Sequence, residues 1–371
     1  MSQKKSIRVC FIGGWRKGYS RTEVIRQGII ANGGSVSECY LEPTKWNPVR
    51  LLYLPLFSLA VIIRTIRLVA SSWNQQCDAF YVPFPAYYDM PAVWIIGKLK
   101  GTPVLFDMLI SKYVTYALDH TIVKKRSFKA ALLRWYDRTA ARLATVIITD
   151  TPDHGALFQK ELGLDARSMV AIPVGSIASA EGIERKPHSD FRVVFYGSYL
   201  PLHGTDVILR AAKLLNNERV IKFIIIGDGP LAKQIQQLAQ ELRLDNVEFV
   251  NSFIDYPDLI EYLVNADLCL GIFGDSPKSD VVVPNKVFDA IALGKPIITA
   301  HSAALDSMGF QHLETLFACK KADPKSLANA ILELKNNNEL RRSIAEKGYA
   351  LYKERFTQKK IGAQFLDIIS R

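Results

Sequence analysis

Residues 283–297, VPNKVFDAIALGKPI, place two opposite charges at the start of a predicted helix. Pro284 suits the first position of a helix, where the free backbone N–H groups favour an anion. Lys286 adds positive charge to the same turn, which costs stability unless an anion binds there. Asp289, one turn further along, can accept hydrogen bonds from ribose hydroxyls. Alone, this segment favours a solvated lysine and a capping acid; together with the three glycine turns described next, it favours a diphosphate site.

Three glycine-marked turns follow predicted strands in the same half of the chain. They are residues 197–206 (GSYLPLHGTD), 227–230 (GDGP) and 271–274 (GIFG). Glycine lets the backbone approach a ligand closely, and each turn leads to a helix whose first N–H groups favour an anion. A fourth turn, Gly13-Gly14, follows the first predicted strand. Together these turns indicate a phosphate-bearing nucleotide.

Two residues of the first half could act on a second substrate. Asp107 ends a predicted strand, and His154 begins a helix after Asp150-Thr151-Pro152. Either could orient an acceptor or relay a proton. For His154, the alternative of a helix-start or packing histidine stays open. Lys17 and Arg21, near the first glycine turn, either bind phosphate or are solvated.

Strand and helix patterns alternate along the whole chain, which predicts two doubly wound α/β domains with parallel sheets. The predicted strands are residues 7–12, 79–83, 103–107, 146–149, 168–172, 192–196, 222–226, 247–250, 268–272 and 296–299. The predicted helices are residues 21–31, 56–71, 92–99, 129–142, 154–162, 205–215, 231–243, 258–265, 284–293, 324–335 and 339–370. The aperiodic residues 173–190 predict a linker between a domain over 1–175 and a second over 190–355. Ligands of such folds bind at the carboxyl ends of the strands, so we expect the chemistry in a crevice between the domains.

The positive charge of the chain is confined to one half. Residues 1–180 contain 23 Lys and Arg against 12 Asp and Glu, whereas residues 181–371 contain 24 of each. This excess of 11 suggests that the first half meets an anionic surface or substrate. A nucleic-acid partner is not expected, because no aromatic pattern accompanies the basic residues. The five scattered cysteines argue against disulfides or a zinc site and suit a reducing cytosol.

Residues 51–70, LLYLPLFSLAVIIRTIRLVA, could contact a membrane without crossing it. The apolar stretch before Arg64 is too short for the ~20 residues that a bilayer span needs. One interpretation is a core helix with a solvated stripe of Ala60, Arg64, Arg67 and Ser71. The other is an interfacial helix whose arginines hold lipid phosphates. The basic charge of this half favours some peripheral membrane contact, on the cytoplasmic face.

Four segments carry a family resemblance: GSYLPLHGTDVILRAAKLL, IIIGDGP, ADLCLGIFG and PNKVFDAIALGKPIIT. They resemble the retaining nucleotide-sugar glycosyltransferases of family 4, whose GT-B fold has two Rossmann-like domains facing a cleft. The resemblance covers nearly all of residues 190–310. In the first half, FIGGW, LFDMLIS and ITDTPDH are similar to the acceptor domain of one branch. The resemblance also implies that the last helix, 356–371, packs back on the first domain.

The resemblance implies roles for individual residues. Asp289 matches the acid that holds the donor ribose, and Lys286 matches the diphosphate site. Gly13 and Gly14 match the loop that closes over the diphosphate. The further donor-binding residues that it implies are Gly197, Ser198, His203, Gly204, Gly227, Asp228, Gly229, Ile272, Phe273, Gly274, Lys278, Asp280, Val282, Val283, Pro284 and Asn285.

The chain departs from the family pattern at three positions. Val281 replaces the first acid of a pair spaced eight residues apart, so Asp280 or Asp275 would have to supply that sugar contact. Ser198 and His203 replace two basic residues, and neutral imidazole is a weaker phosphate anchor than Arg or Lys. Lys278 and Lys286 are then the principal cations for the leaving group.

The resemblance implies a metal-independent transferase that moves a hexose or N-acetylhexosamine from a UDP- or GDP-sugar to a lipid-linked or cell-surface glycan. Negative charge that develops on the leaving phosphate would be stabilised by Lys286 and helix N–H groups, with Asp107 and His154 acting on the acceptor. Retention implies front-side attack, so no enzyme nucleophile and no cofactor is expected. Two alternatives stay open: a non-catalytic subunit that binds a nucleotide or a partner, and a UDP-hexosamine 2-epimerase.

Overall fold

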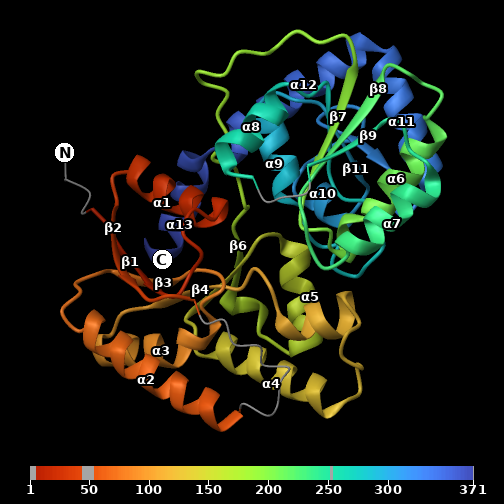
Figure 1. The fold of residues 1–371 in the computed structure, drawn as a ribbon. Helices are drawn as coiled ribbons and strands as arrows, with labels where there is room; N and C mark the ends of the chain where they lie inside the picture. The colour runs from red at the N-terminus through yellow and green to blue at the C-terminus, as the bar shows by residue number, and fades with distance from the viewer. Residues whose placement is uncertain (1–5, 44–53, 251–253, 371) are drawn as a thin grey trace. The chain divides into compact units, whose positions relative to one another are not determined.

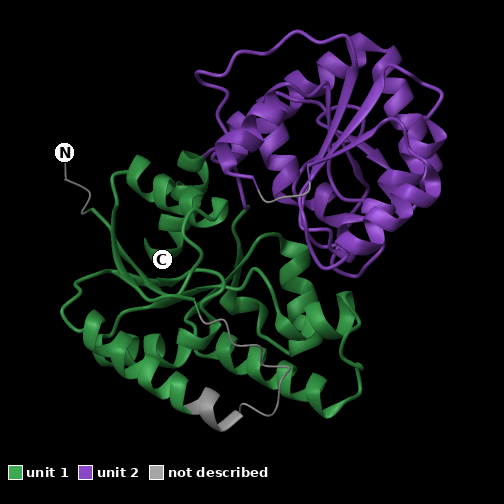
Figure 2. Ribbon diagram, viewed as in Figure 1, with its two compact units in different colours: residues 1–173, 358–371 green, residues 174–357 purple. Residues whose placement is uncertain are grey.

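The chain folds into two compact units, each built around one six-stranded parallel sheet. The computed structural model describes residues 6–43, 54–250 and 254–370. Unit 1 comprises Met1–Pro173 and Gln358–Arg371, and unit 2 comprises Val174–Thr357 (Figure 2). Both sheets are flanked by helices, so the predicted doubly wound α/β architecture is confirmed.

The sheet of unit 1 has the strand order β2-β1-β3-β4-β5-β6. Its strands are β1 Arg8–Gly13, β2 Ser35–Tyr40, β3 Ala79–Val82, β4 Val104–Asp107, β5 Val146–Thr149 and β6 Met169–Ala171. Its helices are α1 Ser20–Ala31, α2 Leu54–Ser72, α3 Met90–Lys100, α4 Phe128–Arg142, α5 Pro152–Leu162 and α13 Gln358–Ser370. The sequence analysis missed β2, an edge strand whose residues SVSECY are mostly polar and partly exposed.

The order of these strands determines which helices share a face of the sheet. The connections from β2 to β3, β3 to β4 and β4 to β5 all run in one direction across the sheet, whereas β1 to β2 runs the opposite way. Right-handed crossovers therefore place α2, α3 and α4 on one face and α1 on the other. Figure 1 shows α2, α3 and α4 below the sheet, and α1 with α13 above it. The larger core of unit 1 lies under α2–α4 and includes Phe80, Val93 and Phe106.

The sheet of unit 2 has the strand order β12-β11-β10-β7-β8-β9. Its strands are β7 Phe191–Tyr196, β8 Ile221–Ile226, β9 Val247–Val250, β10 Leu268–Leu270, β11 Ile297–Ala300 and β12 Phe317–Cys319. Its helices are α6 Thr205–Leu214, α7 Ala232–Leu242, α8 Tyr256–Val264, α9 Asn285–Ala292, α10 Ala303–Ser307, α11 Pro324–Asn336 and α12 Asn338–Leu351. The short edge strand β12 was also missed.

Two predicted boundaries differ from the structure. The residues predicted as a linker, 173–190, belong almost wholly to unit 2, where Ser176 is fully buried. The predicted helix over 339–370 is three segments: α12, a π-helical turn at Tyr352–Phe356, and α13. Helix α13 belongs to unit 1 and packs on α1 so closely that a Cβ on Gly362 would lie 2.0 Å from the carbonyl carbon of Gly28.

Helix α2 exposes Arg67 and Ser71 of the predicted solvated stripe, but it also exposes apolar side chains, and Arg64 of the stripe is largely buried. Ile62, Ile63 and Ile66 are exposed, the last of them 63%. Arg64 is only 13% exposed and forms an ion pair with Asp89, so it is not free to hold lipid phosphate as predicted. Residues 51–53 of the predicted membrane segment lie outside the described residues. Among the helices that the structure describes, none has the length and apolarity of a bilayer span.

Candidate functional site

The three glycine turns of unit 2 meet at the carboxyl edge of its sheet, because their backbones touch. A Cβ on Gly227 would lie 2.0 Å from the carbonyl oxygen of Gly197, and one on Gly229 would lie 1.8 Å from that of Ser198. A Cβ on Gly204 would lie 2.5 Å from the backbone nitrogen of Gly274. The sequence analysis attributed these glycines to a close approach of ligand. In the structure they permit the close approach of the turns to one another.

Lys286, in the first turn of α9, points inward to this cluster of turns. The residue is 6% exposed, and its Nζ lies 3.4 Å from His203 Nε2. The same nitrogen lies 5.2 Å from the ring centroids of Phe195 and Tyr196. A Cβ on Gly197 would be 3.1 Å from it. The ammonium is thus at the end of β7, beside the first glycine turn, rather than on the surface.

His203 and Lys286 present two donors to one space. The backbone N–H of Leu200 donates to His203 Nδ1 at 3.5 Å, which leaves the proton of the neutral ring on Nε2. Burial, with the charges of Lys286 and Lys278, lowers the pKa of His203 well below its usual value, so the ring is neutral. His203 Nε2 and Lys286 Nζ lie within hydrogen-bond distance of each other, and an anionic oxygen that entered this space would accept from both.

Burial lowers the pKa of Lys286 to about 7 from its ordinary 10.5, although the nearby Asp289 opposes this shift. An anion bound beside the ammonium would raise that pKa again, because an opposite charge favours the protonated form. Anion binding at this site therefore takes up a proton near neutral pH.

Asp289 does not have a free carboxylate for ribose. Its Oδ1 accepts hydrogen bonds from Ser176 Oγ at 2.5 Å and Tyr256 hydroxyl at 2.9 Å, and its Oδ2 accepts one from Tyr196 hydroxyl at 2.5 Å. Burial raises its pKa, and these three donors oppose the rise. The carboxylate ties α9 to β7, α8 and the segment after Val174. The ribose contact stays a prediction, and it would require one of these hydroxyls to leave.

The other residues assigned to the donor occupy varied positions. Ile272, Phe273, Val282 and Val283 are buried apolar residues. Pro284 is the N-cap of α9 and Asn285 its first residue. Asp228 is exposed, and its carboxylate accepts from the N–H of Gly229. Asp280 is exposed and forms an ion pair with Lys321. Lys278 is half-buried.

One polar group at this edge was missed. Thr205, the first residue of α6, follows His203 and Gly204 directly, and it is 3% exposed. Among the described residues, its Oγ1 has no hydrogen-bond partner. A buried hydroxyl without a partner at a helix start suits a ligand oxygen. Only the Gly-Thr sequence at a helix start could have pointed to it. The described residues contain no cluster of His, Cys, Asp and Glu that could hold a metal ion.

In unit 1, the Gly13-Gly14 turn is held by an internal acid. The N–H of Gly14 donates to Asp89 Oδ2 at 2.7 Å, and Arg64 pairs with the same carboxylate. A Cβ on Gly13 would lie 2.7 Å from Asp89 Oδ2, and its φ of +115° requires glycine. The predicted diphosphate contact stays a prediction. The backbone N–H of Gly14 already donates to Asp89.

Asp107 and Arg21 form a fully buried pair. Arg21 Nε donates to Asp107 Oδ2 at 2.8 Å, and its Nη1 donates to the carbonyl of Ile172 at 2.8 Å. Tyr81 hydroxyl donates to the same carboxylate at 2.8 Å. The sequence analysis expected Arg21 to bind phosphate or to be solvated. Both expectations are wrong, because Arg21 is buried and paired with Asp107. The acceptor role of Asp107 stays a prediction, and the structure shows the residue joining α1 to β3, β4 and the end of β6.

His154, unlike Asp107, has one polar atom without a hydrogen-bond partner among the described residues. Its Nδ1 lies 2.5 Å from Asp150 Oδ1, and its ring packs 4.2 Å from that of Phe158. Thr151 caps α5 by accepting from the backbone N–H of His154. Among the described residues, His154 Nε2 has no hydrogen-bond partner. With the Nδ1 proton directed at the carboxylate, Nε2 is a hydrogen-bond acceptor.

Residues 177–351 match the family model described as Glycosyl transferases group 1. A chitobiosyldiphosphodolichol beta-mannosyltransferase of Candida albicans is 24% identical over 89% of this chain and 76% of its own length. A lipopolysaccharide core biosynthesis glycosyltransferase of Rhizobium meliloti is 25% identical over 61% of this chain and 63% of its own. An uncharacterised glycosyltransferase of Methanocaldococcus jannaschii is 26% identical over 42% and 41%. The chain thus spans less than two thirds of two of these three relatives.

Solved structures resemble the whole chain. Anabaena HepE in complex with UDP and glucose superposes with a TM-score of 0.70 at 15% identity, over 98% of this chain and 99% of that one. Sucrose-phosphate synthase from Thermosynechococcus elongatus has a TM-score of 0.71 at 16% identity, over 98% of both chains. The chain therefore has the GT-B fold, and its residues 177–351 match the group 1 glycosyl transferases.

Proposed function

We propose that this protein transfers a hexose or N-acetylhexosamine from a nucleoside diphosphate sugar to a lipid-linked or polysaccharide precursor glycan. The observation that carries the proposal is the pair of inward donors, Lys286 Nζ and His203 Nε2, beside the three glycine turns. This pair lies within the segment that matches the glycosyl transferase model. The complexes of HepE with UDP and with UDP-glucose support a nucleoside diphosphate as the ligand.

The donors act on the departing phosphate. Cleavage of the anomeric C–O bond develops negative charge on the β-phosphate, and an ammonium in a buried site stabilises that charge strongly. Lys286 supplies the full charge, while His203 and the N–H groups that begin α9 add hydrogen bonds. We expect the protein's own cations to suffice without a divalent ion. Transfer with retention, by front-side attack, leaves the departing phosphate oxygen to take the acceptor's proton.

His154 is the side chain that we assign to the acceptor. Asp150 holds its Nδ1–H, so Nε2 can accept a hydrogen bond from an acceptor hydroxyl. Asp107, by contrast, is committed to Arg21 and Tyr81. Its part in acceptor binding would be to position the strand ends of unit 1.

A lipid-linked acceptor would lie in a membrane, so the protein would have to bind at a membrane surface to reach it. The two relatives named for chitobiosyldiphosphodolichol and for lipopolysaccharide core synthesis support such an acceptor for this chain. The exposed isoleucines of α2 and the basic charge of residues 1–180 support peripheral contact with the cytoplasmic face of a bilayer. The epimerase alternative gains no support from these relatives, all of which are named as transferases.

A donor panel tests the proposal. UDP- and GDP-linked glucose, mannose and N-acetylglucosamine are each incubated with the protein and total lipid extract, and nucleoside diphosphate release is followed with and without EDTA. One donor should be consumed only when lipid is present, and EDTA should not change the rate. Tight donor binding by calorimetry without any release would favour the non-catalytic subunit instead.

A further inference from the structure

A groove of about 460 Å³ lies in unit 1 between the ends of α3 and α4. Its walls come from α3, from the end of α4, and from the two loops that lead into β4 and β5. The lining residues are Trp94, Gly97, Lys98, Gly101, Thr102, Pro103, Val104, Arg142, Leu143, Ala144 and Thr145. Val104 begins β4, whereas Asp107 ends it, so the groove lies one strand length, about 10 Å, from the edge where the glycine turn and Asp107 lie.

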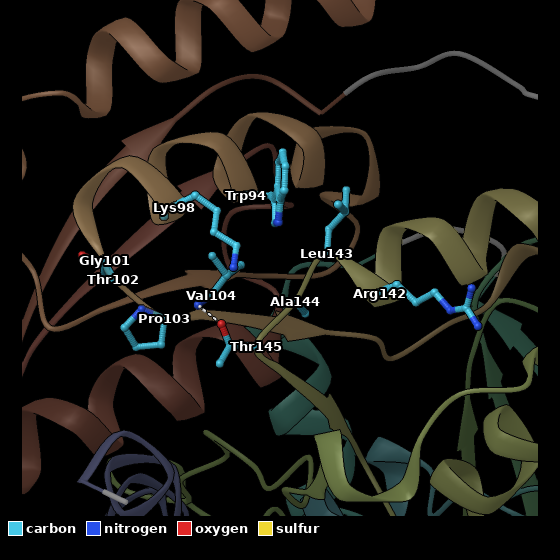
Figure 3. Close-up of a pocket in the computed structure, with 11 residues that line it drawn as sticks. Trp94, Lys98, Gly101, Thr102, Pro103, Val104, Arg142, Leu143, Ala144 and Thr145 are labelled. Carbon is cyan, nitrogen blue, oxygen red and sulfur yellow. Dashed lines mark hydrogen bonds between the residues drawn. The ribbon is translucent and has the colours of Figure 1, made fainter.

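The charge of the groove selects an anion. Lys98 and Arg142 are its only charged lining residues among those that the structure describes, and both are basic. Each lies in the last turn of its helix, where the helix dipole is equivalent to roughly half a negative charge. The two helix ends together offset about one of the two positive charges. Because Arg142 points away from the groove (Figure 3), Lys98 is the cation that faces a ligand there.

The side chains divide the groove into a polar floor and an apolar rim. Figure 3 shows the side chain of Lys98 extending from α3 towards Val104, whereas the side chain of Arg142 points away from the groove. Thr145 Oγ1 closes the floor by accepting from the backbone N–H of Val104 at 3.0 Å. Trp94, 39% exposed, stands on the rim. A tryptophan beside a lysine is the combination that membrane–water interfaces favour.

The groove opens among the helices that carry most of the exposed apolar residues of this unit; Ile30, on α1, is the exception. These residues lie on or next to α2, α3 and α4, which cover one face of the sheet: Leu59, Ile62, Ile63, Ile66, Trp73, Trp94, Leu99, Ile122, Phe128 and Trp135. Lys124, Lys125, Arg126 and Lys129 stand beside the last three of them. An apolar face with basic neighbours matches a bilayer that contains anionic lipid.

We infer that this groove binds the phosphodiester headgroup of an anionic glycerophospholipid, with Lys98 on the phosphate and Trp94 at the glycerol level. The inference rests on the membrane contact of the proposed function and identifies its lipid class and its residues. The groove is distinct from the donor site at Lys286. Its role is to hold the acceptor-binding unit on the surface where the acceptor is found.

Vesicle sedimentation tests the inference with the full chain. Phosphatidylcholine vesicles containing 30% phosphatidylglycerol are compared with vesicles of phosphatidylcholine alone. The protein should partition to the anionic vesicles, and Lys98→Ala should lower the partition constant about fivefold, the worth of one cation at such a surface. Lys359→Ala is the matched control, because Lys359 is an exposed lysine of α13, which packs on α1 at the other face. That variant should bind as the native protein does.

Two outcomes would overturn the inference. Equal losses for Lys98→Ala and Lys359→Ala would mean diffuse attraction without a site. Calorimetric binding of inorganic phosphate that depends on Lys98, without any vesicle binding, would mean a site for free phosphate and not for lipid. Thermal midpoints of both variants exclude misfolding. Donor hydrolysis and transfer to a short-chain soluble acceptor are measured separately, so failure of the proposed function would appear there and leave the vesicle result intact.

Discussion

Lys286 is an ammonium in a place where charge is costly until an anion arrives. Its pKa of about 7 makes ligand binding sensitive to pH in the neutral range. Above pH 7 the free protein must take up a proton to bind a diphosphate, so the Kd for UDP or GDP should rise about tenfold per pH unit. Titration calorimetry from pH 6 to 9 measures this slope. In Lys286→Met, which should bind about 10- to 100-fold more weakly at pH 6, the slope should vanish.

The same residue should oppose folding. Its pKa is lower in the folded chain than in the unfolded chain, so the unfolded state holds more protons between pH 7 and 10.5, and stability rises with pH through that window. Below pH 7 the full penalty is present. Lys286→Met should therefore raise the unfolding free energy at pH 6 by up to about 5 kcal/mol, the worth of a pKa lowered from 10.5 to about 7. Urea denaturation at pH 6 checks the sign; a destabilised variant would contradict the burial of the ammonium.

Asp150 and His154 should act as one unit. Asp150→Asn and His154→Gln should each lower kcat, with His154→Gln losing about 100-fold, while the KM for the donor stays unchanged. The double variant should lose no more than the worse single variant, because the acid acts only through the histidine. Multiplied losses, or a raised donor KM, would show that His154 packs α5 and does not touch the acceptor.

For individual residues, the sequence predicted which residue types lie at the site but not which side chains bind one another there. The Lys286 position at a helix start was predictable from Pro284 and the local spacing. That Asp289 binds Tyr196, Tyr256 and Ser176 was not, because these donors come from segments 33 to 113 residues away. The buried ion pair of Arg21 with Asp107 could not be predicted for the same reason, because the two residues are 86 positions apart.

Among the elements, the packing of α13 on α1 is the most sensitive to a single atom. Gly28 and Gly362 meet backbone to backbone, and neither a rotamer change nor a flexible side-chain end could relieve a Cβ there. Gly362→Ala should destabilise unit 1 by about 1–3 kcal/mol through overpacking. Lys359→Ala, on the same helix but exposed, is the control. Thermal unfolding with protease protection of α13 measures both; an unchanged Gly362→Ala midpoint would contradict this contact.

Most strands were predictable from the sequence, but two of the four edge strands were not. Val146–Thr149 matches its predicted bounds because a short apolar run identifies a buried strand. The edge strand Val247–Val250 also matches, although it is only partly buried, because its run is apolar at three of four positions. Of the two edge strands that were missed, β2 is mostly polar and β12 has only three residues. The end of α12 before α13 was also not predicted, because the apolar periodicity continues through the π-helical turn.

Across the whole molecule, the residues proposed for donor binding and those proposed for acceptor and membrane binding lie in different units. Unit 2 carries Lys286 and His203, which we propose to hold the diphosphate, in a segment that matches the glycosyl transferase model. Unit 1 contains the basic half of the chain, His154 and the lipid groove. The two-unit architecture was predictable from the alternation of strands and helices. The place of residues 174–190 was not, because the burial of Ser176 depends on Asp289 and Tyr352.

Calorimetric titration of UDP and of GDP into the native protein, Lys286→Met and the charge-retaining Lys286→Arg tests the central claim most directly. The account predicts binding of at least one nucleotide to the native protein at pH 6.5, partial retention with arginine, and at least a tenfold loss with methionine in a fully folded variant. Equal affinity in all three proteins would mean that the ammonium beside His203 does not hold the diphosphate, and the assignment of the donor site would be wrong.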